Sequence, residues 1–295
     1  MSIRVTELGE AESRPRHVAI GTFDGVHLGH QAVIDDADTV LTFEPHPLEV
    51  LNPAAAPKLI MPFKVKRDVI DGLGVEELVV IPFDREFSAI APEGFIEQVL
   101  IDRLGAGRVS VGENFRFGAK AKGDPEMLAS RSEFSTRIVP LVEVDGETVS
   151  STRIRALVAA GEVDVARRYL GAPFMLEGTV VEGDRRGREL GFPTANLVPD
   201  DRLVTPGHGV YAAFANGVCA AVSIGVRPTF ATGRGVLIEA CLIDHDDDLY
   251  GQNLRIAFVQ RLRGERRFAS VEDLIAQMHR DVEEARSLCA SFQPS

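Results

Sequence analysis

The pattern of predicted secondary structure changes near Gly171, and this change constrains the chain more than any other feature of its 295 residues. Before Gly171, short apolar segments of strand type alternate with segments of helical periodicity. After two further helical segments end there, strand-like segments follow one another through glycine-rich or polar turns. Because the chain is also long for a single hydrophobic core, we predict two domains, residues 1–171 and residues 172–295.

The first domain is predicted to be an α/β domain with a parallel sheet covered on both faces. Its predicted strands are HVAIGTF, TVLTF, ELVVIPF, RVSVGE and TRIVPLV. Its predicted helices are one from about His27, then FKVKRDVIDGLG, FIEQVLIDRLG and EMLASRSEF. Ligands of such sheets bind beyond the carboxyl ends of the strands. The segment GTFDGVHLGH, residues 21–30, lies at such an end.

The second domain is predicted to be a compact antiparallel barrel followed by one helix. The segments MLEGTVVEG, GVYAAFANG, CAAVSIG, VLIEACLID and LRIAFVQRL are the predicted strands. In the final helix, SVEDLIAQMHRDVEEARSL, Ser270 is the predicted N-cap. The apolar positions of this helix repeat at helical spacing and are Leu274, Ile275, Met278, Val282 and Ala285.

The charge and hydropathy of the chain limit the kinds of molecule that it is expected to bind. A net charge of −12 argues against broad binding to nucleic acid or anionic membranes. The arginines gathered in DRRGRELG and STRIR still suit an anionic small molecule. No apolar segment approaches the roughly 18 residues of a membrane helix. The first residues lack the apolar centre of a signal peptide, so we expect a cytoplasmic protein.

The three cysteines, Cys219, Cys241 and Cys289, lie far apart in the sequence. Their spacing predicts neither a zinc site nor a disulfide pair. Cys219 and Cys241 stand in apolar segments, which predicts buried and inert thiols.

GTFDGVHLGH carries the strongest chemical signal. Gly21 and Gly25 allow a tight turn and a close approach of the backbone to a ligand. His27 and His30 share one face of the next helical turn, and Gly29 leaves that face uncovered. A helix N-terminus with two imidazoles suits a phosphate whose charge grows during transfer, so the histidines are predicted to stabilise a transition state. The alternatives are a pair of surface histidines or a metal site.

GTFDGVHLGH resembles the H-x-G-H signature of the nucleotidyltransferase superfamily, in the form found in the bacterial bifunctional riboflavin kinase/FAD synthetase family. Three more segments fit that family in order: TFEPHP (42–47), VGENFRFG (111–118) and SSTRIR (150–155). Beyond them, GDRRGRELGFPTAN (183–196), GVYAA, SIGVRPTF and IEACLID…DLYG resemble its riboflavin kinase part. The resemblance implies a Rossmann-like nucleotidyltransferase domain and then a six-stranded Greek-key barrel with a C-terminal helix.

The resemblance also implies two reactions, both in-line displacements at phosphorus. In the first, the barrel transfers a phosphoryl group from MgATP to riboflavin and produces FMN. In the second, the N-terminal domain joins FMN to the AMP part of another ATP, producing FAD and pyrophosphate. The expected ligands are therefore Mg²⁺, ATP, riboflavin, FMN and FAD, and the oligomeric state stays open.

In the first domain the resemblance extends to particular residues. Ser151, Thr152 and Arg155 are expected to hold the leaving pyrophosphate, although SST alone is an ordinary N-cap run. Asn114 is expected to anchor flavin or nucleotide. The other cofactor-binding positions implied are Gly21, Phe23, Asp24 and Gly29.

Two interpretations stay open for the phenylalanines of VGENFRFG and for the histidine of TFEPHP. Phe115 and Phe117 either offer flat surfaces near the flavin or belong to the core. His46, held between two prolines, either lines the nucleotide pocket or belongs to a structural loop.

In the second domain, GDRRGRELGFPTAN is predicted to contain a flap that closes over a polyphosphate. The cofactor-binding positions implied there are Gly183, Gly187 and Arg188. Thr194 and Asn196 share one face of a strand, and their oxygen atoms suit Mg²⁺ held jointly with ATP phosphates. By resemblance, Glu239 is the general base that takes the proton of the attacking alcohol. The plainer interpretations are a turn before an ordinary strand and a glutamate on a solvent-facing strand.

One departure from the family pattern leads to an alternative function. Only Gln31–Val40 separates the histidine motif from TFEPHP, which leaves room for roughly two helical turns where the family usually has a longer helix. The first alternative is therefore a riboflavin kinase with weak or altered nucleotidyltransferase activity. The second is a non-catalytic flavin-binding regulator, although a pure binder needs neither the base nor the two histidines.

Overall fold

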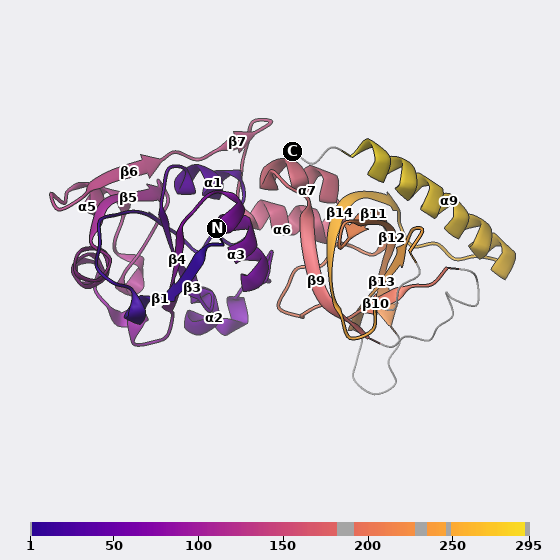
Figure 1. Cartoon of the computed structure of the whole chain (residues 1–295), viewed down its shortest axis with the longest axis horizontal. Coiled ribbons are helices and arrows are strands. Elements are labelled where there is room, and N and C mark those ends of the chain that lie inside the picture. Colours follow the sequence, from indigo (N-terminus) through magenta and orange to yellow (C-terminus); the bar gives the residue numbers. More distant parts are fainter. Residues whose placement is uncertain (1, 182–191, 228–234, 246–248, 293–295) are drawn as a thin grey trace. The chain divides into compact units, whose positions relative to one another are not determined.

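The computed structural model describes residues 2–181, 192–227, 235–245 and 249–292. The chain forms two compact units, each with its own sheet (Figure 1). Unit 1 contains Met1–Pro57 and Pro62–Ser151, and unit 2 contains Lys58–Met61 and Thr152–Ser295.

Helices α6 (Ser151–Ala160) and α7 (Val163–Leu170) were predicted within the first domain, yet from Thr152 onward they group with unit 2. The reason is packing, since α7 buries one face and contacts the barrel strands β9 (Phe174–Val181) and β14 (Asn253–Arg263). The compact units thus divide before the change in sequence pattern at Gly171.

Unit 1 is built on a parallel sheet of six strands in the order β1-β4-β3-β2-β5-β6 (Figure 1). Its strands are β1 (Arg4–Glu7), β2 (Arg16–Ile20), β3 (Thr39–Glu44), β4 (Glu77–Pro82), β5 (Ala106–Gly112) and β6 (Ser135–Val139). The central strands are buried on both faces, which is why their segments are continuously apolar. The predicted α/β fold is confirmed. The edge strand β1 is an addition, since its short polar segment gave no strand signal.

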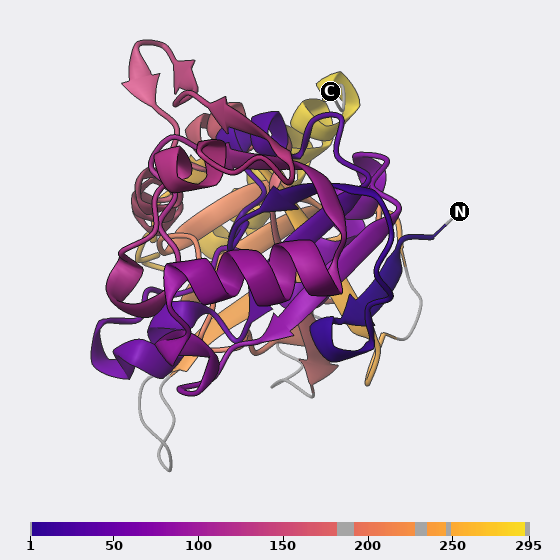
Figure 2. The same cartoon turned by 90° about the vertical axis from the view of Figure 1, so that its left-hand side faces the viewer.

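Helices follow most of the strands and cover the sheet. Helix α1 (Leu28–Ile34) contacts β2 and β5, and its seven residues match the two turns predicted. Helix η4 (Phe95–Arg103) continues α4 and lies across one face of the sheet (Figure 2), where its apolar residues join the core. The remaining elements are α2 (Pro47–Leu51), α3 (Phe63–Gly72), α4 (Pro92–Gly94), α5 (Pro125–Ala129), the short turns η1 (Leu8–Glu10), η2 (Pro53–Ala55), η3 (Phe87–Ala89) and η5 (Ala119–Ala121), and the hairpin β7 (Glu143–Val144) with β8 (Glu147–Thr148).

The strand order of unit 1 reverses at β2, which pairs with β3 on one side and with β5 on the other. In a parallel sheet, a crevice opens beyond the carboxyl ends of the strands at such a switch point. Two segments far apart in sequence therefore lie beside it: residues 21–27 after β2 and residues 113–118 after β5.

Unit 2 contains a closed barrel of six strands in the order β10-β13-β12-β11-β14-β9, with every neighbouring pair antiparallel. The strands are β9 (Phe174–Val181), β10 (Ala195–Leu197), β11 (Gly209–Ala215), β12 (Val218–Arg227), β13 (Gly235–Leu242) and β14 (Asn253–Arg263). Strands β11, β12 and β13 pair in sequence order and β14 returns beside β11, which is a Greek key. The predicted barrel is confirmed.

Helix α9 (Val271–Ser291) packs on β11, β12 and β14. Ser270 caps it as predicted, with the Oγ atom accepting a hydrogen bond from the amide of Asp273 at 3.1 Å. Ala285 is fully buried against the barrel. Asp281, also buried, forms an ion pair of 2.7 Å with Arg263 of β14, so both apolar and ionic contacts attach the helix.

The cysteines correct the sequence prediction. Cys219 of β12 and Cys289 of α9 form a disulfide with Cα atoms 6.0 Å apart, so the expectation of no disulfide pair was wrong. The two residues are 70 positions apart, and only the packing of α9 across β12 brings them together. Cys241 is a thiol, and burial raises its pKa to about 11, as expected for an inert cysteine.

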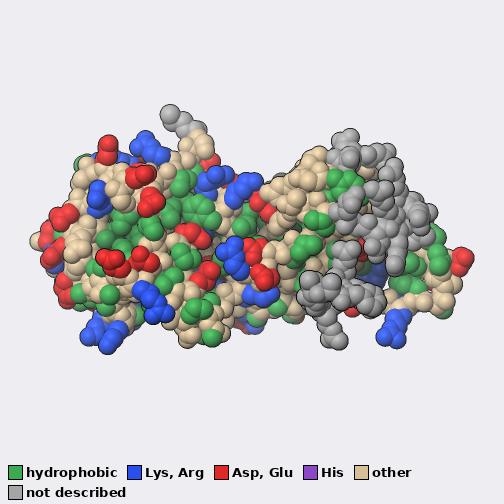
Figure 3. All heavy atoms as spheres, turned by 90° about the horizontal axis from the view of Figure 1, so that it is seen from below, with side chains coloured by type: hydrophobic (Ala, Val, Ile, Leu, Met, Phe, Trp, Pro, Cys, Tyr) green, Lys and Arg blue, Asp and Glu red, His purple; other side chains and the backbone are tan. Residues whose placement is uncertain are grey.

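The surface of unit 1 mixes charges of both signs. On the face drawn in Figure 3, acidic and basic side chains alternate over this unit rather than gathering by sign. Among the helices that the structure describes, none is both long and apolar enough to cross a membrane.

Candidate active sites

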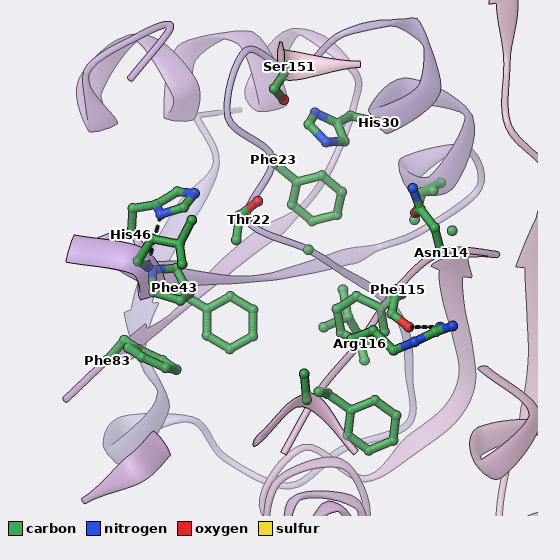
Figure 4. Close-up of a pocket in the computed structure, with 18 of the residues that line it drawn as sticks. Thr22, Phe23, His30, Phe43, His46, Phe83, Asn114, Phe115, Arg116 and Ser151 are labelled. Carbon is green, nitrogen blue, oxygen red and sulfur yellow. Dashed lines mark hydrogen bonds between the residues drawn. The ribbon is translucent and has the colours of Figure 1, made fainter. Parts of the chain in front are cut away.

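A cavity of about 1020 Å³ lies beyond the carboxyl edge of the unit 1 sheet (Figure 4). Residues that follow β2, β3, β4, β5 and β6 all line it, as expected at a switch point. Seven residues predicted from the sequence meet in this cavity: Gly21, Phe23, His27, Gly29, His30, Asn114 and Ser151.

The β2–α1 loop, residues 21–27, has an unusual backbone. Phe23 and Val26 have positive φ angles of 49° and 39°, and Gly25 has a φ of 92°. A positive φ is costly for a side chain branched at Cβ, such as that of Val26. Conformations of this kind persist only where surrounding contacts hold them, and they are concentrated at functional sites.

His27 is the N-cap of α1 and presents a defined tautomer. Its Nδ1 atom accepts a hydrogen bond from the amide of His30 at 3.2 Å. A nitrogen that accepts carries no proton, so the proton of the neutral ring is on Nε2. The cap therefore makes His27 a hydrogen-bond donor through Nε2 at the edge of the cavity.

His30 lies against His27 and Phe23. The two imidazoles stack with ring centroids 3.5 Å apart, and the ring of Phe23 meets His30 edge-on at 5.4 Å. A Cβ atom at Gly29 would approach the His27 ring to 3.3 Å, and one at Gly21 would approach the Phe23 ring to 3.0 Å. Both glycines are therefore needed for close packing of the rings, and the predicted open face at Gly29 is occupied by His27.

A chain of six phenylalanines lines the cavity, and the three that Figure 4 labels lie across the cavity from His30. Successive ring centroids lie 5.4 to 6.3 Å apart. The members are Phe43, Phe83, Phe87, Phe95, Phe117 and Phe115. We call this chain the aromatic wall. Phe115 and Phe117 line the cavity and also pack against the core, and their place near a flavin stays a prediction.

His46 has a structural role in its loop, and its role at a nucleotide stays a prediction. It lines the cavity, and its Nδ1 atom caps α2 by accepting a hydrogen bond from the amide of Leu48 at 3.2 Å. Asn114, on the other side of the cavity in Figure 4, comes from the segment that follows β5.

The residues of SSTRIR are only partly gathered at the cavity. Ser151 lines it, and its hydroxyl donates to the carbonyl oxygen of Asp24 at 2.9 Å. Thr152 and Arg155 belong to unit 2, where the Arg155 guanidinium donates to the carbonyl oxygen of Lys58 at 2.6 Å. Their role at pyrophosphate stays a prediction.

The sequence missed two residues that hold the β2–α1 loop. Lys66 of α3 donates from Nζ to the carbonyl oxygen of Thr22 at 3.1 Å, and the hydroxyl of Thr42 donates to the same oxygen at 3.2 Å. Lys66 and Thr42 are both buried. A lysine in an amphipathic helix normally indicates the solvent face, so the sequence held no signal for Lys66.

In unit 2, three polar residues form a row across the barrel. Glu239 of β13 pairs with Asn196 of β10 on one side and with Ser223 of β12 on the other. Directly opposed residues of antiparallel strands point to the same face with close Cβ atoms. Asn196 is 7% exposed, whereas Glu239 and Ser223 are half-buried. We call these residues the polar row, and Ser223 is a member that the sequence did not indicate.

The other predicted residues of unit 2 are described in part. Thr194 is half-buried and comes directly before β10, two positions from Asn196. Gly183, Gly187 and Arg188 lie outside the described residues. Within the described ranges, no cluster of three His, Cys, Asp or Glu side chains could hold a metal ion.

The fold and the two sites together define an enzyme of two parts. The first is a Rossmann-like domain with a nucleotidyltransferase motif at the switch point of its sheet. The second is a barrel in which the acid Glu239 lies opposite the polar side chains of Asn196 and Ser223. The family described as FAD synthetase matches residues 9–153, and the family described as riboflavin kinase matches residues 170–289.

Relatives of the whole chain agree with both matches. The chain is 36% identical over 293 residues to the bifunctional riboflavin kinase/FMN adenylyltransferase of Listeria monocytogenes, covering 94% of this chain and 93% of that protein. It is 37% identical to the protein of the same name from Bacillus subtilis, covering 91% and 90%. The chain therefore belongs to the bifunctional riboflavin kinase/FMN adenylyltransferase family.

A solved structure shows that the likeness extends to the fold. The crystal structure of a protein titled a macrolide-efflux protein, from Streptococcus pneumoniae, matches with a TM-score of 0.87 and 30% identity. The match covers 96% of this chain and 99% of that chain.

Proposed function

We propose that this bifunctional enzyme divides its two activities between the two sites described: unit 1 adenylylates FMN at the switch-point cavity, and unit 2 phosphorylates riboflavin at the polar row. The observation that carries the proposal is the cavity of unit 1. It brings two stacked histidines and an aromatic wall together in one space of about 1020 Å³, large enough for a nucleotide beside a flavin.

The aromatic wall and the histidines suit different parts of the substrates. Flat apolar rings favour stacking and apolar contact with the isoalloxazine of FMN. The histidine side of the cavity then receives the phosphates. In this proposal the reacting phosphorus lies near the β2–α1 loop, whose histidines line the cavity.

In adenylyl transfer, a phosphate oxygen of FMN bonds to the α-phosphorus of ATP while the bond from that phosphorus to the bridging oxygen of pyrophosphate breaks. Negative charge grows on the non-bridging and leaving oxygens. His27, fixed as a donor through Nε2, and His30 are proposed to stabilise that charge by hydrogen bonding. Ser151, Thr152 and Arg155 are proposed to hold the pyrophosphate, with Asn114 as an anchor for the flavin or nucleotide.

In riboflavin phosphorylation, the terminal hydroxyl of the ribityl chain bonds to the γ-phosphorus of ATP and ADP leaves. Glu239 is proposed to accept the hydroxyl proton as general base. Its half-buried carboxylate lies opposite Asn196, so base and ATP-binding oxygens share one face of the barrel. The functional division of the chain is proposed at residue 171, next to residue 170, where the match to the riboflavin kinase family begins.

Magnesium fits the donors of unit 2. Mg²⁺ prefers oxygen and is often held by few protein groups together with substrate phosphates. The hydroxyl of Thr194 and the side-chain oxygen of Asn196 are proposed to hold the ion, whose charge would neutralise the phosphates of ATP. Since ATP and flavin are the expected partners of both sites, we place the enzyme in the cytoplasm and assign it small-molecule substrates.

A time course with riboflavin and MgATP tests the proposal. Chromatography of the flavins should show FMN first and FAD after it. FMN alone would favour the alternative of a riboflavin kinase with impaired adenylyl transfer. Binding of riboflavin with neither product formed would favour a flavin-binding regulator.

A further inference from the structure

The β2–α1 loop is held by side chains at every second carbonyl. The carbonyl of Asp24 accepts a hydrogen bond from Ser151, and that of Val26 accepts one from the side-chain amide of Gln31 at 2.9 Å. The carbonyl of Thr22 accepts bonds from Lys66 and Thr42, as described above. Because the loop contains two residues with unfavourable positive φ angles, these bonds maintain its conformation.

Lys66 lies on a helix that does not line the cavity, unlike Ser151 and Gln31. Ser151 lines the cavity and Gln31 belongs to α1, whereas Lys66 comes from α3, and no described residue of α3 lines the cavity. Lys66 therefore stands behind the cavity lining, which it contacts through the carbonyl of Thr22.

The acids near Lys66 offset only part of the cost of burying its ammonium, since the pKa of Lys66 is still lowered. Lys66 is only 7% exposed, and burying an ammonium costs free energy that a methionine of similar size would not incur. A buried charge that directs its proton to the backbone of a catalytic loop is instead expected where the loop conformation matters.

Charged groups surround the ammonium on several elements. Burial lowers the pKa of Lys66, while the carboxylates of Glu44 at the end of β3, Asp24 of the loop and Glu49 of α2 act in the opposite direction. These acids favour the charged form, which is the form that can donate to Thr22 most strongly.

We infer that Lys66 is a positioning residue for adenylyl transfer: its ammonium holds the β2–α1 loop through the carbonyl of Thr22 and so sets the placement of His27 at the reacting phosphate. The inference rests on the proposed role of His27. Errors of about 1 Å in the placement of a catalytic group can reduce rates by about 100-fold, which makes such a role measurable.

The test is a double-mutant cycle measured on the full chain. Lys66→Met should lower kcat for FAD formation from FMN and ATP by about 30-fold, with FMN affinity within about twofold because the aromatic wall is untouched. The unchanged affinity for FMN serves as the measure that unit 1 is folded, and riboflavin phosphorylation by the same molecules reports that unit 2 is intact. Lys64→Met is the matched control, since Lys64 is an exposed lysine of the same helix, and it should leave both activities within about twofold.

The background variant His27→Gln separates positioning from general stability. If Lys66 acts through His27, then adding Lys66→Met to His27→Gln should cost less than about threefold. A full 30-fold loss in both backgrounds would overturn the inference, as would a Lys66→Met variant with unchanged kcat. If His27→Gln itself left FAD formation intact, the proposed function of the site would fail instead.

Thr42→Val provides a second variant in case Lys66→Met does not fold. It removes the other hydrogen bond to the Thr22 carbonyl with little change of shape, and kcat should fall by about fivefold, with a smaller fall in the His27→Gln background. An unchanged kcat for this variant, or an equal fall in both backgrounds, would contradict control of the reaction through the Thr22 carbonyl.

Discussion

The two sites prepare for chemistry at phosphorus in different ways. In unit 1 the two histidines come from one short loop and the helix after it, and the backbone conformation of that loop is held from several sides. In unit 2 they are side chains in register across three antiparallel strands. A loop can concentrate donors around a phosphate, whereas a strand register places an acid opposite oxygen ligands.

The chemical character of the groups differs in the same way. Unit 1 presents imidazoles as hydrogen-bond donors, which suits stabilisation of growing negative charge. Unit 2 presents a carboxylate, which suits removal of a proton from an alcohol. The difference indicates that each unit can lose its reaction while the other continues.

The largest effect is expected from His27→Ala combined with His30→Ala. Loss of both donors should reduce FAD formation from FMN and ATP by about 10⁴-fold, because single donors to a developing oxyanion contribute roughly 10²- to 10³-fold. Riboflavin phosphorylation should stay within about twofold, since unit 2 has its own core. His17→Ala, in β2 but outside the cavity lining, is the matched control; loss of FAD formation to the same extent would indicate general damage to unit 1.

Glu239→Gln should reduce FMN formation by about 10³-fold, because the amide keeps the shape of the side chain but cannot take the proton. FMN supplied from outside should still be converted to FAD. Glu284→Gln, an exposed change on α9, is the control and should leave both reactions intact. Undiminished phosphorylation of riboflavin by the Glu239 variant would refute its assignment as the base.

Reduction of the disulfide should affect only one of the two regions, because all three cysteines belong to unit 2. Opening the bond between Cys219 and Cys289 should lower the stability of unit 2 by about 2–4 kcal/mol. Heat inactivation of each activity, with and without dithiothreitol, measures this effect separately for the two reactions. Cys289→Ser should abolish the response, and an equal response of FAD formation would contradict separate stability of the units.

The smallest effect is expected from Thr194→Val. Loss of one oxygen ligand should raise KM for MgATP in riboflavin phosphorylation by about tenfold, equivalent to one hydrogen bond or ligand contact. A titration with Mg²⁺ at fixed ATP should show the same shift. Thr179→Val, an exposed change on β9, is the control, and an unchanged KM for the Thr194 variant would remove Thr194 from the proposed ligand set.

Much of the fold could be predicted because its signals are local. The central strands of unit 1 are buried on both faces and therefore apolar throughout, and Ser270 marks the start of α9 by a capping residue. The loop with its histidines was also predictable, since the relevant residues are consecutive. Site residues that stand close together in the sequence form a motif that can be recognised without the structure.

The missed features all depend on contacts between distant segments. Lys66 meets Thr22 only because α3 packs beside the loop, and Ser223 joins the polar row only through strand register. The pairing of Cys219 with Cys289 requires α9 to cross β12. Neither periodicity nor spacing along one segment records such contacts, so the sequence could not supply them.

Mixing two complementary variants tests the separation of the sites most directly. The Glu239→Gln variant and the His27→Ala/His30→Ala variant are each incubated with riboflavin and MgATP, alone and together, and the flavins are separated by chromatography. We predict no FAD from either variant alone and FAD from the mixture, as FMN released by one chain is adenylylated by the other. FAD formed from riboflavin by either variant alone would contradict the assignment of one reaction to each unit.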